Sequence, residues 1–170
     1  FRGIPAYARE IERRLRRRAT SDETLAAPER ELLESALERF ETTDVFVLRY
    51  DPEQASNLDF HLDDTFAYGE LIADLSLESD AWLSFLLGRP GSEVQGSESL
   101  VDEPVCVRVP LPARSLAVLY GPARFEWEHA VLAYDIEAQR TSITLRTLGP
   151  DLRATEQGRA VVTRARGATD

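Results

Sequence analysis

The sequence predicts a mainly β protein with flanking α-helices, and three observations indicate this fold class. From position 45 onward, short runs of apolar and β-branched residues alternate with turns that contain Gly and Pro. No helical pattern is interleaved between these runs, which argues against a parallel α/β fold. The first 43 residues instead carry apolar side chains at helical spacing. A sandwich or barrel follows, and a jelly roll accommodates this number of strands.

Two amphipathic helices are expected before position 44. One apolar stripe runs from Ile4 to Leu15 and a second from Leu32 to Phe40, with a break between them. Pro28 suits the first turn of the second helix, because the N–H that proline lacks has no partner at that position. We therefore expect a helical flank over residues 1–43.

The β core is expected over residues 44–150. Its strands are predicted, in chain order, at 45–48, 71–77, 81–86, 105–109, 115–120 and 141–145. After Pro150 the chain becomes polar and rich in Arg. The tail over 151–170 is therefore interpreted as either a last helix or a disordered segment.

Length and composition exclude several classes of protein. A chain of 170 residues suits one domain. All 20 basic residues are Arg, so neither Schiff-base chemistry nor a P-loop lysine is available. Cys106 is the single cysteine, which favours a reducing compartment such as the cytoplasm or the nucleus. No apolar run is long enough to span a membrane. Because the sequence starts at Phe1 and has no Met, we expect it to be part of a longer chain.

Charge is distributed unevenly along the sequence. Residues 1–20 carry seven Arg against two Glu, and residues 153–170 carry four Arg against two acidic residues. The segment between them is therefore more acidic than the net charge of −10 of the whole chain indicates. Such a surface repels the phosphate backbone of nucleic acids. A nucleic-acid partner would have to use the basic ends.

The sequence contains two histidines, His61 and His129, and any histidine-based metal site must use them. His61 and Asp63 lie two residues apart and would share one face of an extended segment. Two imidazoles and a carboxylate bind a divalent transition metal on one side, as in non-haem Fe(II) oxygenases. Zn(II) accepts the same ligand types. The alternative is a pair of surface histidines that lie beside acidic residues by chance.

A pair of arginines follows these candidate metal ligands. Arg140 and Arg146 are six residues apart on a predicted strand, so both project to one face, about 20 Å apart. Guanidinium groups bind carboxylates in two-pronged fashion. The pair is therefore interpreted as binding the two ends of one small dianion. The alternative is that both are solvated arginines at the ends of a strand.

Six stretches of the sequence together resemble the AlkB family of Fe(II)/2-oxoglutarate-dependent dioxygenases. They are residues 1–7, 50–53, 61–70, 109–119, 127–130 and 140–146. The resemblance implies a double-stranded β-helix, which is a cupin-like jelly roll. It also implies that His61, Asp63 and His129 form the catalytic iron site.

The resemblance also assigns the cosubstrate and substrate residues. It implies that Tyr50, together with Arg140 and Arg146, binds 2-oxoglutarate. It places Asp64 beside the metal, near the mouth through which the substrate enters. Among the aromatic residues that flank the ligand segments, Phe66 and Trp127 are candidates to line the substrate pocket.

The activity implied by the resemblance is oxidative N-demethylation. Two substrates compete: methylated lysine on a protein, such as actin, and N6-methyladenine in DNA. Acidic residues next to the site segments favour the cationic lysine; they are Asp64, Glu70, Asp74, Glu126 and Glu128. A third interpretation is a non-catalytic jelly-roll scaffold that binds protein partners through its basic N-terminal helix.

Overall fold

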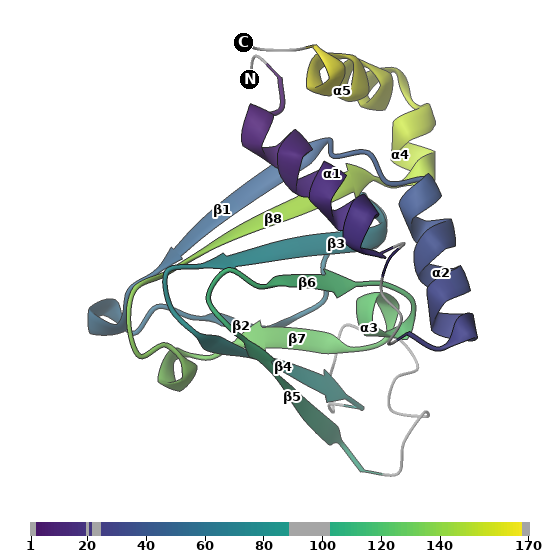
Figure 1. Ribbon diagram of the computed structural model, residues 1–170. Coiled ribbons are helices and arrows are strands. Elements are labelled where there is room, and N and C mark those ends of the chain that lie inside the picture. Colours follow the sequence, from purple (N-terminus) through teal and green to yellow (C-terminus); the bar gives the residue numbers. More distant parts are fainter. Residues whose placement is uncertain (1–2, 20, 22–24, 89–102, 168–170) are drawn as a thin grey trace. The chain divides into compact units, whose positions relative to one another are not determined.

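The computed structural model describes residues 3–19, 21, 25–88 and 103–167 (Figure 1). Phe1 and Arg2, which open the first of the six matching stretches, lie outside this range. The strands in the described residues are β1 (Asp44–Tyr50), β2 (Leu58–His61), β3 (Tyr68–Leu77), β4 (Ala81–Leu87), β5 (Val105–Leu111), β6 (Leu116–Leu119), β7 (Glu128–Val131) and β8 (Arg140–Leu148).

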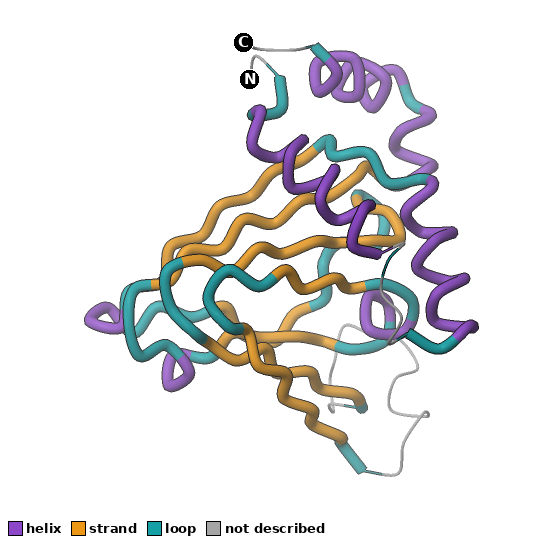
Figure 2. The backbone as a smooth tube through the Cα atoms, viewed as in Figure 1, coloured by secondary structure: helices purple, strands orange, loops and turns teal. Residues whose placement is uncertain are grey.

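These strands form two four-stranded sheets, which Figure 2 shows in orange. One sheet has the order β1-β8-β3-β6 and the other has the order β2-β7-β4-β5. The chain passes back and forth between the two sheets, so most sequence neighbours are not sheet neighbours. This strand order is that of a jelly roll, and it confirms the predicted fold class.

In the described chain, two α-helices precede the strands and two follow them. The first two are α1 (Ala6–Ala19) and α2 (Ala27–Glu38), and the last two are α4 (Pro150–Ala154) and α5 (Glu156–Arg166). The short α3 (Pro122–Phe125) lies between β6 and β7. Pro28 lies in the first turn of α2, as its missing N–H allows. None of the described helices is both long and apolar enough to cross a membrane.

The chain divides into two compact units. Unit 1 comprises residues 1–46, 64–73 and 144–170, and unit 2 comprises residues 47–63 and 74–143. β1, β3 and β8 each continue from one unit into the other, whereas the sheet β2-β7-β4-β5 belongs wholly to unit 2. The predicted metal ligands His61, Asp63 and His129 all lie in unit 2.

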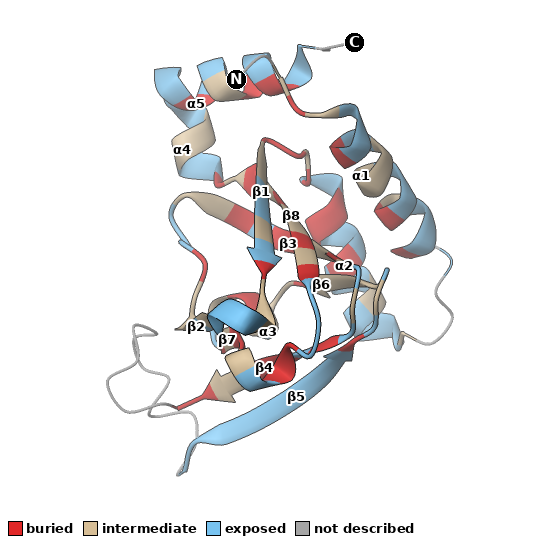
Figure 3. Ribbon diagram, turned by 90° about the vertical axis from the view of Figure 1, so that its left-hand side faces the viewer, coloured by how far each residue is buried: buried red, intermediate tan, exposed pale blue. Residues whose placement is uncertain are grey.

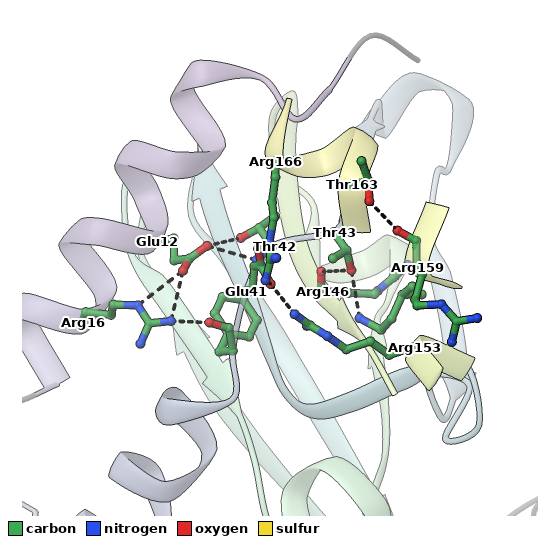
Figure 4. Close-up of polar contacts among 12 residues, drawn as sticks. Glu12, Arg16, Glu41, Thr42, Thr43, Arg146, Arg153, Arg159, Thr163 and Arg166 are labelled. Atoms are coloured by element: carbon green, nitrogen blue, oxygen red, sulfur yellow. Dashed lines mark hydrogen bonds and ion pairs between the residues drawn. The ribbon is translucent and has the colours of Figure 1, made fainter. Parts of the chain in front are cut away.

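Unit 1 is held together by polar contacts between segments distant in sequence (Figure 4). The Glu41 carboxylate accepts hydrogen bonds from Arg153 and Arg166. Thr43 donates its backbone N–H to the Arg146 carbonyl at 2.9 Å. Its hydroxyl oxygen accepts the N–H of Leu148 at 2.8 Å. These bonds tie the chain just before β1 to β8 and to the C-terminal helices.

The sheet of unit 2 is regular between β4 and β5 and ends at β5. The two strands pair antiparallel without interruption from Ala81 opposite Leu111 to Leu87 opposite Val105. β7 pairs with the other edge of β4 and places His129 opposite Phe85. As the last strand of its sheet, β5 is exposed over most of its length (Figure 3).

Candidate functional site

A β-bulge places the two histidines opposite each other. β2 and β7 pair antiparallel with Leu58 opposite Val131 and His61 opposite His129, so β2 holds one residue more than β7 between these two pairs. In an unbroken register Phe60 would lie opposite His129, and His61 would point to the other face of the sheet, because side chains alternate along a strand. The extra residue shifts the alternation of side chains along β2 by one position and brings both imidazoles to one face.

The structure brings the three predicted metal ligands together. The ring centroids of His61 and His129 are 4.4 Å apart, and His129 Nε2 lies 3.5 Å from Asp63 Oδ2. One ligand atom from each residue lies within 4.8 Å of the other two. Asp63 is not part of β2 but follows it in an irregular segment, so its position depends on that loop. The donor set fits a divalent transition metal.

A backbone hydrogen bond fixes the form of the His61 ring. Its Nδ1 lies 2.8 Å from the carbonyl oxygen of Asp59. Because a carbonyl oxygen only accepts, Nδ1 must carry the hydrogen of the neutral ring. Nε2 then keeps its lone pair and is the nitrogen that can bind a metal.

Arg124 holds the loop that carries Asp63. Its Nη1 donates to the Asp63 carbonyl oxygen at 2.9 Å, and the arginine is only 1% exposed. The guanidinium group also lies 4.9 Å from the centre of the Phe125 ring. Sequence reasoning did not identify Arg124, because an isolated arginine in a Gly-Pro-Ala-Arg-Phe segment carries no recognisable signal.

Tyr50 and Arg140, two of the three predicted cosubstrate residues, meet in unit 2. They lie on the adjacent strands β1 and β8, with the guanidinium 5.0 Å from the centre of the Tyr50 ring. Burial raises the pKa of the Tyr50 phenol, although the charge of Arg140 lowers it. The phenol therefore keeps its proton at neutral pH and can donate a hydrogen bond.

Arg140 is completely buried, and some of its N–H groups donate hydrogen bonds to β3, the strand on the other side of β8. Its Nε donates to Ser76 Oγ at 2.9 Å, and its Nη2 donates to Asp74 Oδ2 at 3.1 Å. Among the described residues, Nη1 is buried and has no hydrogen-bond partner. A buried N–H without an acceptor is costly, so this group fits the carboxylate of a small acid.

Arg146 lies on the same strand but in unit 1. Its Nη1 is 3.4 Å from Asp44 Oδ2, and its guanidinium lies over the rings of Tyr68 and Phe46. Each arginine of the pair therefore has an aspartate on a neighbouring strand and an aromatic ring beside it. The role of Arg146 toward 2-oxoglutarate stays a prediction.

Asp64 and Phe66, predicted to contact the substrate, lie in unit 1. Asp64 Oδ1 accepts the backbone N–H groups of Phe66 and Ala67 at 2.8 and 2.9 Å, so this carboxylate builds the turn after the metal ligands. Phe66 is 65% exposed. Their contact with a substrate stays a prediction.

Trp127, the third predicted substrate residue, lines an apolar pocket of about 190 Å³ in unit 2. The other lining residues are Phe85, Val107 and Ala123. The Phe85 ring centroid is 6.2 Å from that of His129, so the pocket borders the candidate metal site. Phe85 was not predicted from the sequence. In the structure it pairs with Val107 on one side and His129 on the other, which places all three side chains on one face of the sheet.

Comparison with known proteins gives clear relatives, although no protein-family model matches the chain. Over 95% of its own length, the chain is 35% identical to the human alpha-ketoglutarate-dependent dioxygenase alkB homolog 4. Over 89% of its own length, it is 30% identical to the mouse protein of that name. It is also 24% identical, over 61% of its length, to the Caenorhabditis elegans DNA N6-methyl adenine demethylase. The chain covers 55% of the human protein and 51% of the mouse protein, and thus spans about half the length of these relatives.

Proposed function

The chain belongs to the AlkB family of α-ketoglutarate-dependent dioxygenases, and on that premise we propose that it demethylates a substrate oxidatively, using Fe(II) and 2-oxoglutarate. The observation that carries this proposal is the convergence of His61, Asp63 and His129, whose ligand atoms lie within 4.8 Å of one another. Two imidazoles and one carboxylate are the ligand set of non-haem iron oxygenases.

The residues around this centre would have separate tasks. His61 Nε2, His129 and Asp63 would hold the iron, and Arg124 would keep the Asp63 backbone in place. Arg140 would bind a carboxylate of 2-oxoglutarate, beside the Tyr50 hydroxyl. When bound, the iron and 2-oxoglutarate would supply the oxidising chemistry with dioxygen as the oxidant: one oxygen atom of O2 enters succinate as 2-oxoglutarate loses carbon dioxide, and the other hydroxylates an N-methyl group, which then leaves as formaldehyde.

Product formation tests the proposal directly. Purified protein supplied with Fe(II) and 2-oxoglutarate in air is expected to form succinate slowly without substrate, and faster with a methylated substrate that also releases formaldehyde. Absence of succinate under all these conditions would contradict the proposal and favour the interpretation as a non-catalytic scaffold.

For the substrate, we favour a methylated lysine on a protein, such as actin. The pocket that borders the metal site is lined only by apolar side chains, and two of them, Phe85 and Trp127, are aromatic. Aromatic faces attract methylated ammonium groups through cation–π interactions. A flipped nucleobase instead needs hydrogen-bond partners for its polar edge, and none of the four lining side chains except the Trp127 indole N–H offers one.

Fewer of the acidic side chains in unit 2 can attract a cationic substrate than the sequence suggests. Within unit 2, the Asp74 carboxylate is paired with Arg140, and Glu128 is only 2% exposed. Of the acidic residues named for this unit, Glu126 alone is exposed. The lining of the pocket is therefore a stronger support for methyl-lysine than the acidic surroundings are.

Methylated DNA is the second candidate, because one relative is named as a DNA N6-methyl adenine demethylase. A panel of methyl-lysine peptides and N6-methyladenine oligonucleotides, assayed for formaldehyde release, separates the two. Turnover of the oligonucleotide would fall steeply with added salt, since phosphate contacts release counterions. We expect turnover of the peptide and only a shallow salt dependence.

A further inference from the structure

The buried pair formed by Arg140 and Asp74 bears on how the cosubstrate is selected. The two residues lie on the adjacent strands β8 and β3, and both belong to unit 2. Nη2 of Arg140 is 3.1 Å from Asp74 Oδ2. The arginine side chain is 0% exposed and the aspartate side chain 19% exposed, so the pair is largely shielded from water.

These contacts fix which edge of the guanidinium group is available. Ser76 Oγ accepts from Nε, and Asp74 accepts from Nη2. Nη1, on the remaining edge, has no acceptor among the described residues. An incoming carboxylate would therefore approach at Nη1, while Asp74 keeps its own contact at Nη2.

Arg140 and Asp74 carry charges of opposite sign. A buried cation requires a counter-ion, and Asp74 provides one before any acid binds. A carboxylate that binds at Nη1 shares the same cation, and it also lies close to a second negative charge in a medium of low polarity. Asp74 thus stabilises the cosubstrate-free protein and weakens cosubstrate binding.

We propose that Asp74 is a resident counter-ion of Arg140 that determines the affinity of the site for 2-oxoglutarate. This rests on the proposed function, in which Arg140 binds one of the carboxylates of 2-oxoglutarate. By competing for the guanidinium group, Asp74 raises the 2-oxoglutarate concentration at which the site fills. It also disfavours acids that would bring further negative charge to this edge.

The test is Asp74→Asn, which preserves size and removes the charge. Binding of 2-oxoglutarate in the presence of Mn(II), which prevents turnover, is measured by calorimetry, and melting temperatures are measured with and without 2-oxoglutarate. We expect the dissociation constant to fall about tenfold, which corresponds to about 1.4 kcal/mol. We also expect the melting temperature without 2-oxoglutarate to fall, and the increase on adding 2-oxoglutarate to become larger.

Glu78→Gln is the matched control. Glu78 is exposed, follows β3 directly and accepts a hydrogen bond from Thr141, so this change removes one negative charge near the same two strands without touching Arg140. Its dissociation constant for 2-oxoglutarate is expected to stay within twofold of the parent value. An equal gain in both variants would indicate a general charge effect and overturn the proposal.

Other outcomes are equally decisive. An unchanged or weaker affinity in Asp74→Asn would mean that Asp74 only orients Arg140, and the proposal would be wrong. Asp74→Ser, which also lacks the charge, is expected to change affinity in the same direction. If either variant is unfolded alone, folding on addition of 2-oxoglutarate supports the proposal, and failure to fold contradicts it.

Arg140→Ala distinguishes this proposal from the proposed function. If that variant is folded and binds 2-oxoglutarate as tightly as the parent, Arg140 does not bind the acid and the cosubstrate assignment itself fails. If Arg140→Ala weakens binding but Asp74→Asn does not strengthen it, only the role of Asp74 is refuted.

Discussion

His61 and His129 are cross-strand partners, with ring centroids 4.4 Å apart, only because β2 contains one residue more than β7 between the paired positions. The metal site thus depends on a local irregularity of the sheet as well as on the ligands themselves. β-Bulges often re-aim a side chain beside an active site, and this bulge re-aims an imidazole.

Asp63→Asn should abolish metal-dependent activity without unfolding the protein. The change keeps the size of the side chain but removes the one anionic ligand that balances the charge of the metal, so Fe(II) affinity should fall. The melting temperature of the metal-free protein should be similar, since a domain of this size has a core that does not need the metal. Calorimetric titration with metal and succinate assays measure the two effects.

Glu126→Gln is the control for Asp63→Asn, because Glu126 is an exposed acid in the same unit. Metal affinity should be unchanged in this variant. Full demethylation by Asp63→Asn would show that the chemistry does not use this site.

Arg124→Met should weaken metal binding although Arg124 is not a ligand. Loss of the bond to the Asp63 carbonyl oxygen frees the loop that positions this ligand, and residues that orient metal ligands typically contribute 10- to 100-fold to affinity, an order-of-magnitude expectation. Metal titration of Arg124→Met is compared with that of Arg49→Met, which changes an exposed arginine of the same unit. Equal metal affinities in the two variants would refute this role for Arg124.

Arg140→Ala should raise the 2-oxoglutarate requirement sharply. A charge-assisted hydrogen bond to a carboxylate contributes about 1.5–3 kcal/mol, so the dissociation constant should rise by roughly one to two orders of magnitude. The dependence of succinate formation on 2-oxoglutarate concentration measures this. Arg146→Ala should act in the same direction if both arginines grip one molecule, whereas an unaffected Arg146→Ala would leave the task to Arg140 and Tyr50.

Trp127→Ala should impair use of a methylated substrate while leaving substrate-free succinate formation unchanged. Trp127 lines the apolar pocket beside His129 but has no part in the metal or cosubstrate contacts described above. The KM for a methyl-lysine peptide should therefore rise, by roughly tenfold for loss of one aromatic contact of about 1–2 kcal/mol. Trp82→Ala is the control, because Trp82 and Phe85 are three residues apart on β4 and so point to opposite faces of the sheet.

The fold class was predictable from the sequence because most strands consist of apolar, β-branched runs that are bounded by turns. β2 and β7 were not predicted, although they carry both histidines. Each has only four residues, and their sequences, Leu-Asp-Phe-His and Glu-His-Ala-Val, mix charged and apolar residues without clear alternation. Their pairing is set by β4 and the bulge, which are tertiary features that periodicity does not reveal.

The candidate site was predictable as residue types, but not as a set of contacts. Two histidines in the whole chain and the spacing of His61 and Asp63 singled out the ligands. Neither pattern reveals that Arg124 supports the Asp63 loop, or that the Asp74 carboxylate pairs with Arg140, because both contacts join segments more than 60 residues apart. Single residues that meet only in the folded chain leave no periodic signal in the sequence.

Glu41 joins the C-terminal helices to the segment before β1 (Figure 4). The hydrogen bond from Arg166 lowers the pKa of this carboxyl group, although partial burial opposes the shift. A folded-state pKa below the unfolded value means that the ionised carboxylate stabilises the protein above the unfolded pKa, about 4.3, and that this contribution is lost as the pH falls through the folded pKa.

Glu41→Gln should therefore lower stability at pH 7 by about 1 kcal/mol or less, since the partners are partly exposed, and the deficit should shrink below about pH 4. Urea denaturation across this pH range measures it, with the exposed Glu34→Gln as control, and a deficit that persists unchanged at low pH would contradict the assigned ion pairs.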